Sequence, residues 1–119
     1  MRRNVLVLSA ALTLLAAAPA AAQASWGAIA VDPETGDYGV AYDFDTAAAA
    51  QRRAKHECAD PHCKVAAWVS NGFAALVRTK SGVYYAGIGR TENLARKKAR
   101  QHAHDSSARY ITSVFSGYS

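Results

Sequence analysis

The sequence predicts an α+β domain in which two strand–strand–helix–strand repeats form one mainly antiparallel sheet with two helices. Three observations favour this fold class. The chain matches itself when it is shifted by 45 or 46 residues, two alanine-rich segments show helical periodicity, and short apolar runs end at Gly, Pro or Asn. The repeats cover residues 26–71 and 72–117 of a single domain, residues 25–119.

The internal repeat keeps its order and register through a whole unit. A shift of 46 residues aligns Ala28, Val31, Gly36 and Tyr38 with Ala74, Val77, Gly82 and Tyr84. A shift of 45 residues then aligns Thr46, Ala50, Ala54, Val69 and Gly72 with Thr91, Ala95, Ala99, Val114 and Gly117. The change of one residue falls between a hairpin and a helix, where an insertion is tolerated best.

Short apolar runs predict the strands. Four of these runs cover residues 28–31, 38–42, 64–70 and 109–115. Pro33 and Gly36 stand between the first two runs, where a turn favours these residue types. Asn71-Gly72 is the strongest hairpin signal in the chain because it separates two further apolar runs. It predicts that the third strand pairs with the fourth, so that both repeats share one continuous sheet.

Two threonines predict where the helices begin. Thr46 caps a helix that runs to about Cys58, and Thr91 caps one that runs to about Ser106, with Glu92 in its first turn. At about 100° per residue, small residues gather on one side of each helix. They are Ala47, Ala50, Ala54 and Cys58 in the first helix and Ala95, Ala99 and Ala103 in the second. The strands must then supply the bulk of the core, through residues such as Ile29, Val40, Val65, Val69, Leu76 and Ile111.

The start of the chain predicts export. Residues 1–24 combine a basic start, an apolar run and a small-residue stretch, which is the pattern of a secretory signal peptide. We expect cleavage between Ala24 and Ser25, and a soluble mature protein in the periplasm or the extracellular medium. The apolar run is too short for a permanent membrane span, so the mature form is expected to have no transmembrane segment.

The two cysteines of the exported part, Cys58 and Cys63, are five positions apart and predict one local disulfide. The alternative is a metal site that adds His56 and His62. Zinc accepts these ligand types, but His56 and Cys58 are two positions apart on a helix and point in different directions. The sequence therefore predicts neither a metal nor another cofactor.

Charge is distributed unevenly along the exported part. Two of the 14 Lys and Arg residues lie in the signal peptide, which leaves 12 bases against nine acids and a net charge of +3. Nine of those bases follow Cys58, and Arg96, Lys97 and Arg100 form the sharpest cluster, with Lys98 at its flank. These side chains are candidate ligands for anionic groups. The alternative is a solvated helix face, and a nucleic acid partner is not expected for an exported chain.

Catalytic patterns are weak in this sequence. His102 and His104 point to different sides of a helix, with His102 toward the sheet and His104 toward water. Asp32, Glu34 and Asp37 lack the spacing of a calcium loop. No serine stands in a nucleophile elbow. The sequence therefore predicts a protein that is not an enzyme and has no catalytic residues.

The aromatic residues suggest a binding surface. The strands are apolar on both faces, so two helices on one face would leave the other face uncovered. Residues that would line it in part are Trp26, Tyr42, Trp68, Tyr84 and Tyr85. An uncovered aromatic face is typical of a site for protein, peptide or glycan. The alternative is a sheet that curls on itself and buries these rings.

Several segments follow one another in a recognisable order. They are Trp26-Gly27-Ala28-Ile29-Ala30, Tyr38-Gly39-Val40-Ala41-Tyr42, the helix ending at Cys58, Cys63-Lys64-Val65, Trp68 and Asn71. In this pattern the chain resembles a secreted bacterial family, the domain of unknown function 4189. The resemblance covers nearly all of residues 26–115. It implies no established activity and no functional residues to transfer.

The chain departs from that family in its cysteines. The resemblance implies a second Cys pair in the second repeat and another pair linking the strands that follow the helices. The matching positions are Ala103 and Ala108, and Phe73 and Phe115. We expect apolar contact to replace the bridge between the two phenylalanines, so that one disulfide remains.

The sequence as a whole favours a non-catalytic exported binding protein. Its class would be an inhibitor, an immunity factor or a surface-interaction module, with a protein or an anionic glycan as partner. The alternatives are a small secreted hydrolase and a structural envelope protein.

Overall fold

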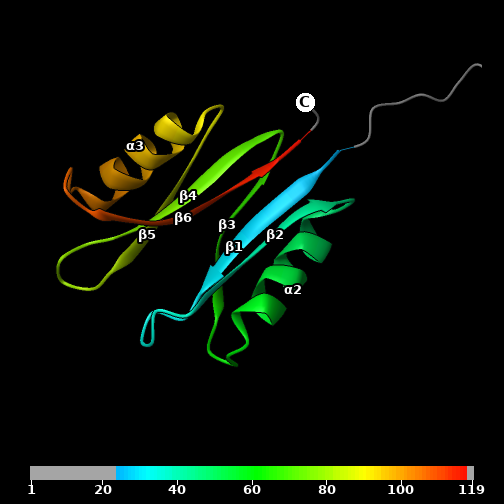
Figure 1. Ribbon diagram of the computed structural model, residues 1–119, viewed down its shortest axis with the longest axis horizontal. Coiled ribbons are helices and arrows are strands. Elements are labelled where there is room, and N and C mark those ends of the chain that lie inside the picture. Colours follow the sequence, from blue (N-terminus) through cyan, green and yellow to red (C-terminus); the bar gives the residue numbers. More distant parts are fainter. Residues whose placement is uncertain (1–23, 118–119) are drawn as a thin grey trace, which may run out of the picture.

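The computed structural model describes residues 24–117, and in them six strands and two helices follow the predicted order (Figure 1). The strands are β1 (Trp26–Val31), β2 (Tyr38–Phe44), β3 (Lys64–Ser70), β4 (Gly72–Arg78), β5 (Tyr84–Gly89) and β6 (Arg109–Ser116). The helices are α2 (Ala47–Cys58) and α3 (Glu92–Ala103). The α+β class and the repeated strand–strand–helix–strand pattern are confirmed. The predicted signal peptide lies outside the described residues, except for Ala24.

The strands form two antiparallel sheets and not the one continuous sheet that the sequence predicted. Sheet A has the strand order β2-β1-β3, and sheet B has the order β5-β4-β6. Each sheet contains the strands of one repeat, with the first strand of that repeat in the centre.

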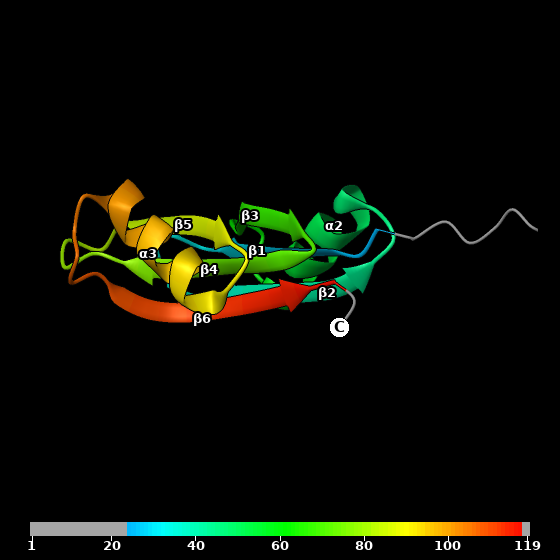
Figure 2. The same cartoon turned by 90° about the horizontal axis from the view of Figure 1, so that it is seen from above.

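The two sheets stack face to face between the two helices, which gives the order α2, sheet A, sheet B, α3 (Figures 1 and 2). The core between the sheets includes Ile29, Val69, Leu76 and Val114. Smaller side chains fill the space under each helix. They are Ala28, Ala30, Ala41, Ala50 and Ala54 between α2 and sheet A, and Val77, Ala99 and Ala108 between α3 and sheet B.

Stacking explains why the strands are apolar on both faces. Each sheet turns one face to its own helix and the other face to the opposite sheet. In a single sheet with both helices on one side, Ile29 and Leu76 would face water, which is unfavourable for large apolar side chains. Both residues are fully buried here.

Asn71 carries the chain from sheet A to sheet B. It is the single residue between β3 and β4, and its backbone φ is 58°. Gly72 already belongs to β4, where it pairs with Ser116. The hairpin predicted at Asn71-Gly72 is therefore wrong, because β3 and β4 pair with strands of different sheets. The same Asn-Gly sequence makes a tight corner between two layers.

Both predicted helix caps are present. The hydroxyl of Thr46 accepts a hydrogen bond from the Ala49 N–H, and that of Thr91 accepts one from the Leu94 N–H, each at 3.1 Å. Helix α2 ends at Cys58, as predicted. Helix α3 ends at Ala103, before the predicted Ser106, because His104 is left-handed and its N–H donates back to the Gln101 carbonyl.

Small residues let each helix lie close to its sheet. A Cβ atom at Gly39 would collide with the carbonyl oxygen of Ala54, and one at Gly87 would collide with the backbone nitrogen of Ala99. The helix backbones therefore contact the strands directly at these points. No helix within residues 24–117 is both long enough and apolar enough to cross a membrane.

Candidate functional site

The strongest candidate site is an open groove where the β1–β2 turn of the first repeat meets sheet B. It has a volume of about 580 Å³. We call it the Tyr–Arg groove, and its lining residues are Pro33, Glu34, Thr35, Gly36, Tyr38, Arg78, Tyr84, Arg109, Tyr110 and Ile111. The groove therefore joins residues from both repeats and both sheets.

Strand register places two arginines side by side in this groove. Arg78 on β4 pairs with Tyr84 on β5 and with Arg109 on β6. The three residues thus form a row across sheet B, on the face opposite Val77, which packs toward α3. The guanidinium carbon of Arg78 lies 5.8 Å from the centre of the Tyr84 ring.

Asp32 holds the turn that forms the opposite side of the groove. Its carboxylate accepts a hydrogen bond from the Glu34 N–H, and its backbone carbonyl accepts one from the Gly36 N–H, both at 2.8 Å. The Asp32 side chain is buried. Its hydrogen bond with Asp60, and then the Glu34 N–H, hold the pKa of Asp32 below its usual value. A buried, hydrogen-bonded residue therefore fixes the turn in place.

The residues of the basic cluster predicted on the second helix make different contacts, and Arg96 is bonded to neighbouring side chains. The carboxylate of Glu92 accepts hydrogen bonds from Arg96 at 2.8 Å, from Ser113 at 3.0 Å and from Tyr110 at 3.2 Å. The Arg96 guanidinium carbon lies 3.7 Å from the centre of the Tyr110 ring. The hydrogen bonds from Arg96 and then Ser113 lower the pKa of Glu92, and Glu92 raises that of Arg96. Arg96 thus joins α3 to β6.

Arg100 is also part of the scaffold, whereas Lys97 is not. The Nε–H of Arg100 donates to the Ala108 carbonyl at 3.0 Å, which ties α3 to the start of β6. Lys97 is exposed and, among the ion pairs of the described residues, takes part in none. A second open groove, at the end of α3, includes both residues with Gln101, His104, Asp105 and Ser106. The three candidate anion ligands therefore do not form one exposed cluster, because Arg96 and Arg100 are partly buried and hydrogen-bonded whereas Lys97 is exposed.

The five candidate aromatic residues do not share one face. Trp26 packs on the α2 side of sheet A, and Trp68 lies on that same side, opposite Ala28, with 47% of its surface exposed. Tyr85 packs on the α3 side of sheet B, whereas Tyr84 contacts the core between the sheets. Tyr42 lies on the edge strand β2 and is 60% exposed. Of the five candidates, only Tyr84 lines the Tyr–Arg groove.

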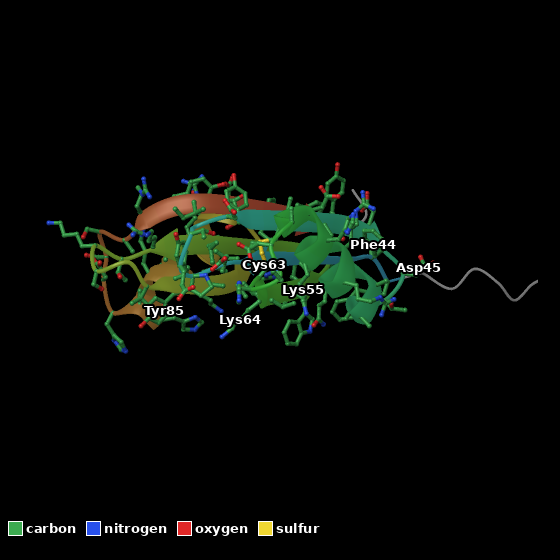
Figure 3. All side chains as sticks on the ribbon, turned by 90° about the horizontal axis from the view of Figure 1, so that it is seen from below. Phe44, Asp45, Lys55, Cys63, Lys64 and Tyr85 are labelled. Atoms are coloured by element: carbon green, nitrogen blue, oxygen red, sulfur yellow. A yellow bond between two sulfur atoms is a disulfide. The ribbon has the colours of Figure 1, made fainter. Side chains whose placement is uncertain are left out.

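Cys58 and Cys63 form a disulfide, as predicted (Figure 3). The bond joins the end of α2 to the residue before β3, with 6.3 Å between the two Cα atoms. The cysteine metal site considered as an alternative is therefore not formed, because neither sulfur is a free thiolate.

Two further groups of titratable side chains lie outside the Tyr–Arg groove. Asp32, Asp60 and His62 are the one group in residues 24–117 whose side chains are placed to share a metal ion. His102 and His104 do not converge. The Nδ1 of His102 lies 2.7 Å from the Ala86 carbonyl, toward the sheet as predicted, whereas His104 is exposed at the end of α3.

Sequence reasoning missed most of the Tyr–Arg groove. Arg78 and Arg109 are 31 positions apart, and neither stands in a basic run. The internal repeat supplies the one usable signal, because Tyr84 repeats Tyr38 and both lie in the groove. Only the pairing of β4 with β6 and the stacking of the two sheets bring the remaining residues together.

Comparison with known proteins agrees with the fold. No curated protein sequence matches the chain. The solved NMR structure of Rv1813c from Mycobacterium tuberculosis is similar, with a TM-score of 0.63 and 28% sequence identity. The match covers 82% of this chain and 79% of that one. The model of the domain of unknown function DUF4189 matches residues 26–114. The chain therefore belongs to the DUF4189 family.

Proposed function

We propose that this protein is a non-catalytic exported binding protein, and that the Tyr–Arg groove is its ligand-contacting surface. One observation carries the proposal. The groove brings two arginines and three tyrosines from distant parts of the chain to one open surface. Tyr and Arg, with Trp, are the residue types most enriched among those that dominate binding energy at protein interfaces.

The non-catalytic part rests on the hydrogen bonds of the described serines. Ser25, Ser81, Ser107, Ser113 and Ser116 bond to Asp, Ser, Thr, Tyr or Glu side chains, and none of these side-chain bonds goes to a histidine. A serine nucleophile needs an adjacent base. A histidine paired with one of these serines would have favoured a hydrolase.

Export is supported by the disulfide and by the predicted signal peptide. Disulfides persist in oxidising compartments such as the periplasm and the extracellular medium. A groove on a cross-linked, four-layer scaffold is fixed in shape before a ligand arrives, which lowers the entropic cost of binding. These properties suit an inhibitor, an immunity factor or a surface-interaction module whose partner is a protein or an anionic glycan.

Site-specific cross-linking in living cells tests this proposal. A photoreactive phenylalanine analogue replaces Tyr38, which lines the groove, or Tyr42, which is exposed on the same strand outside it. We expect an adduct of defined mass from position 38 and none from position 42.

Two outcomes would contradict the proposal. Equal adducts from both positions would mean that the groove has no special role, and adducts from neither would mean that it is not a ligand surface. Turnover of a peptide, ester or glycan by the purified protein would contradict its non-catalytic part.

A further inference from the structure

We propose that the Tyr–Arg groove binds an oxyanion of the phosphate or sulfate type between the guanidinium groups of Arg78 and Arg109. This assignment rests on the proposed function, since it names the chemical class of ligand for the same groove. Nothing in the family description assigns a ligand to these residues.

The sheet register is the first reason. Arg78 and Arg109 are directly opposite each other on antiparallel strands. Such residues have Cα atoms about 4.5–5.5 Å apart and turn their side chains to the same face. Like charges in this arrangement repel each other and destabilise the strand pair. An anion between the two guanidinium groups replaces this repulsion with attraction to both.

The second reason is that Arg78 and Arg109 have no carboxylate partner among residues 24–117. Among residues 24–117, the arginines that form ion pairs are Arg53, with Glu57, and Arg96, with Glu92. Neither Arg78 nor Arg109 has a carboxylate within ion-pair distance in that part of the chain. The fold thus keeps two cationic groups together while it neutralises Arg96 with a carboxylate one helical turn away.

The hydrogen-bonding capacity of the groove is the third reason. Guanidinium groups only donate hydrogen bonds, and their planar fork matches the oxygen atoms of phosphate or sulfate. The ring of Tyr84 lies against Arg78 and limits the orientations of its guanidinium. The Tyr84 hydroxyl stands close to Gly36 in the facing turn, at the same side of the groove. The guanidinium of Arg78 therefore lies between the Tyr84 ring and Gly82 of the β4–β5 turn, and Arg78 lines the groove.

Glu34 sets the charge balance of the groove. It is the one carboxylate among the lining residues, and it is exposed on the turn that faces the arginine row. A carboxylate in this position repels an incoming anion and weakens its binding. Its removal is therefore expected to strengthen binding, whereas removal of an arginine weakens it.

The test is an NMR titration of the protein, isolated after expression of the full chain, with inorganic phosphate or sulfate at constant ionic strength. Saturable shifts are expected at Arg78, Arg109 and residues 33–36. Arg78→Gln or Arg109→Gln is expected to weaken binding roughly tenfold, because each removes a charge-assisted hydrogen bond. Glu34→Gln is expected to tighten binding about two- to threefold.

Matched controls separate a site from net charge. Lys97→Gln with Lys98→Gln removes two positive charges from exposed positions outside the groove, one more than either arginine variant, and is expected to leave binding unchanged. Without phosphate, Arg109→Gln is expected to melt at the same temperature as the parent or higher, since it relieves repulsion. With phosphate, the parent is expected to gain more thermal stability than Arg109→Gln, whose binding is weaker.

Two further ligands distinguish a soluble phosphate compound from a lipid headgroup as the source of the bound oxyanion. Binding of glycerol phosphate but not of phosphatidylglycerol vesicles supports a soluble phosphate ligand, and binding of the vesicles supports a lipid headgroup carrying the same group. Equal weakening by the groove and helix variants, or the absence of saturable shifts, overturns the oxyanion site. Adducts from position 38 that persist in that case leave the groove as the ligand surface for another class of ligand.

Discussion

The ring of Phe73 packs against the ring of Phe115 across the β4–β6 ladder, with 4.8 Å between their centres and 45° between their planes. The two residues are directly opposed on the α3 side of sheet B. The resemblance to the family implied a cysteine pair at these positions and apolar contact in its place here. The contact is present, so an aromatic pair joins the two strands.

Substitution of the pair is expected to reveal a direct interaction. Phe73→Ala and Phe115→Ala should each lower the free energy of unfolding by about 1–3 kcal/mol, below the usual range for a fully buried Phe because both rings are partly exposed. A double-mutant cycle in urea should give a coupling energy of about 0.5–1.5 kcal/mol. A coupling near zero would mean that the rings are neighbours without a specific interaction.

The Cys58–Cys63 disulfide is expected to stabilise the domain modestly. The bond closes a loop between residues five positions apart, and a loop this short gives about 2 kcal/mol in the chain-entropy model. Reduction should therefore lower the melting temperature by several degrees. Thiol labelling after denaturation checks the starting state, with no reactive thiol expected before reduction and two expected after it.

The second repeat should accept a copy of this disulfide. The turns after α2 and α3 have the same backbone hydrogen bonds, from Cys63 N–H to the Asp60 carbonyl and from Ala108 N–H to the Asp105 carbonyl. Ala103 and Ala108 occupy the places of the two cysteines. We expect Ala103→Cys with Ala108→Cys to form a disulfide and to raise the melting temperature.

Each single cysteine variant serves as the control for that experiment, because it changes the same side chain without a cross-link. An oxidised double variant that melts no higher than its reduced form would show that the two turns differ in geometry.

Glu92 is expected to make stability depend on acidity. The hydrogen bond from Arg96, and then that from Ser113, hold its pKa below the usual value of 4.5. Its contribution is therefore complete above the pKa of the unfolded chain and is lost as the pH falls through the lower pKa of the folded state. Urea unfolding between pH 7 and pH 3 should show stability falling below about pH 4.5.

Glu92→Gln should reduce that fall without removing it. The pKa values of Asp32 and Asp105 are lowered as well, by the side-chain hydrogen bond that Asp32 shares with Asp60 and by the one that Asp105 accepts from Ser107, and both carboxylates remain in the variant. An unchanged pH profile would mean that the Glu92–Arg96 pair contributes little to folding.

The sequence by itself determined the local structure of this protein. Thr46 and Thr91 marked both helix starts, because a cap depends on hydrogen bonds within a single turn. The spacing of Cys58 and Cys63 predicted their disulfide, because that bond also joins residues close together in the sequence. The internal repeat predicted the order of the elements, since each copy carries its own turns and caps.

Only the tertiary structure decided how the two copies meet. The apolar pattern required cover for both faces of every strand, but curling of one sheet and stacking of two satisfy it equally. The conformation of Asn71 and the core around Ile29 and Leu76 select the stack. The stack brings the turn of the first repeat over Arg78 and Arg109, and the β4–β6 register sets those arginines side by side. The groove could not be predicted from spacing, because it arises from contacts between segments that are far apart in the chain.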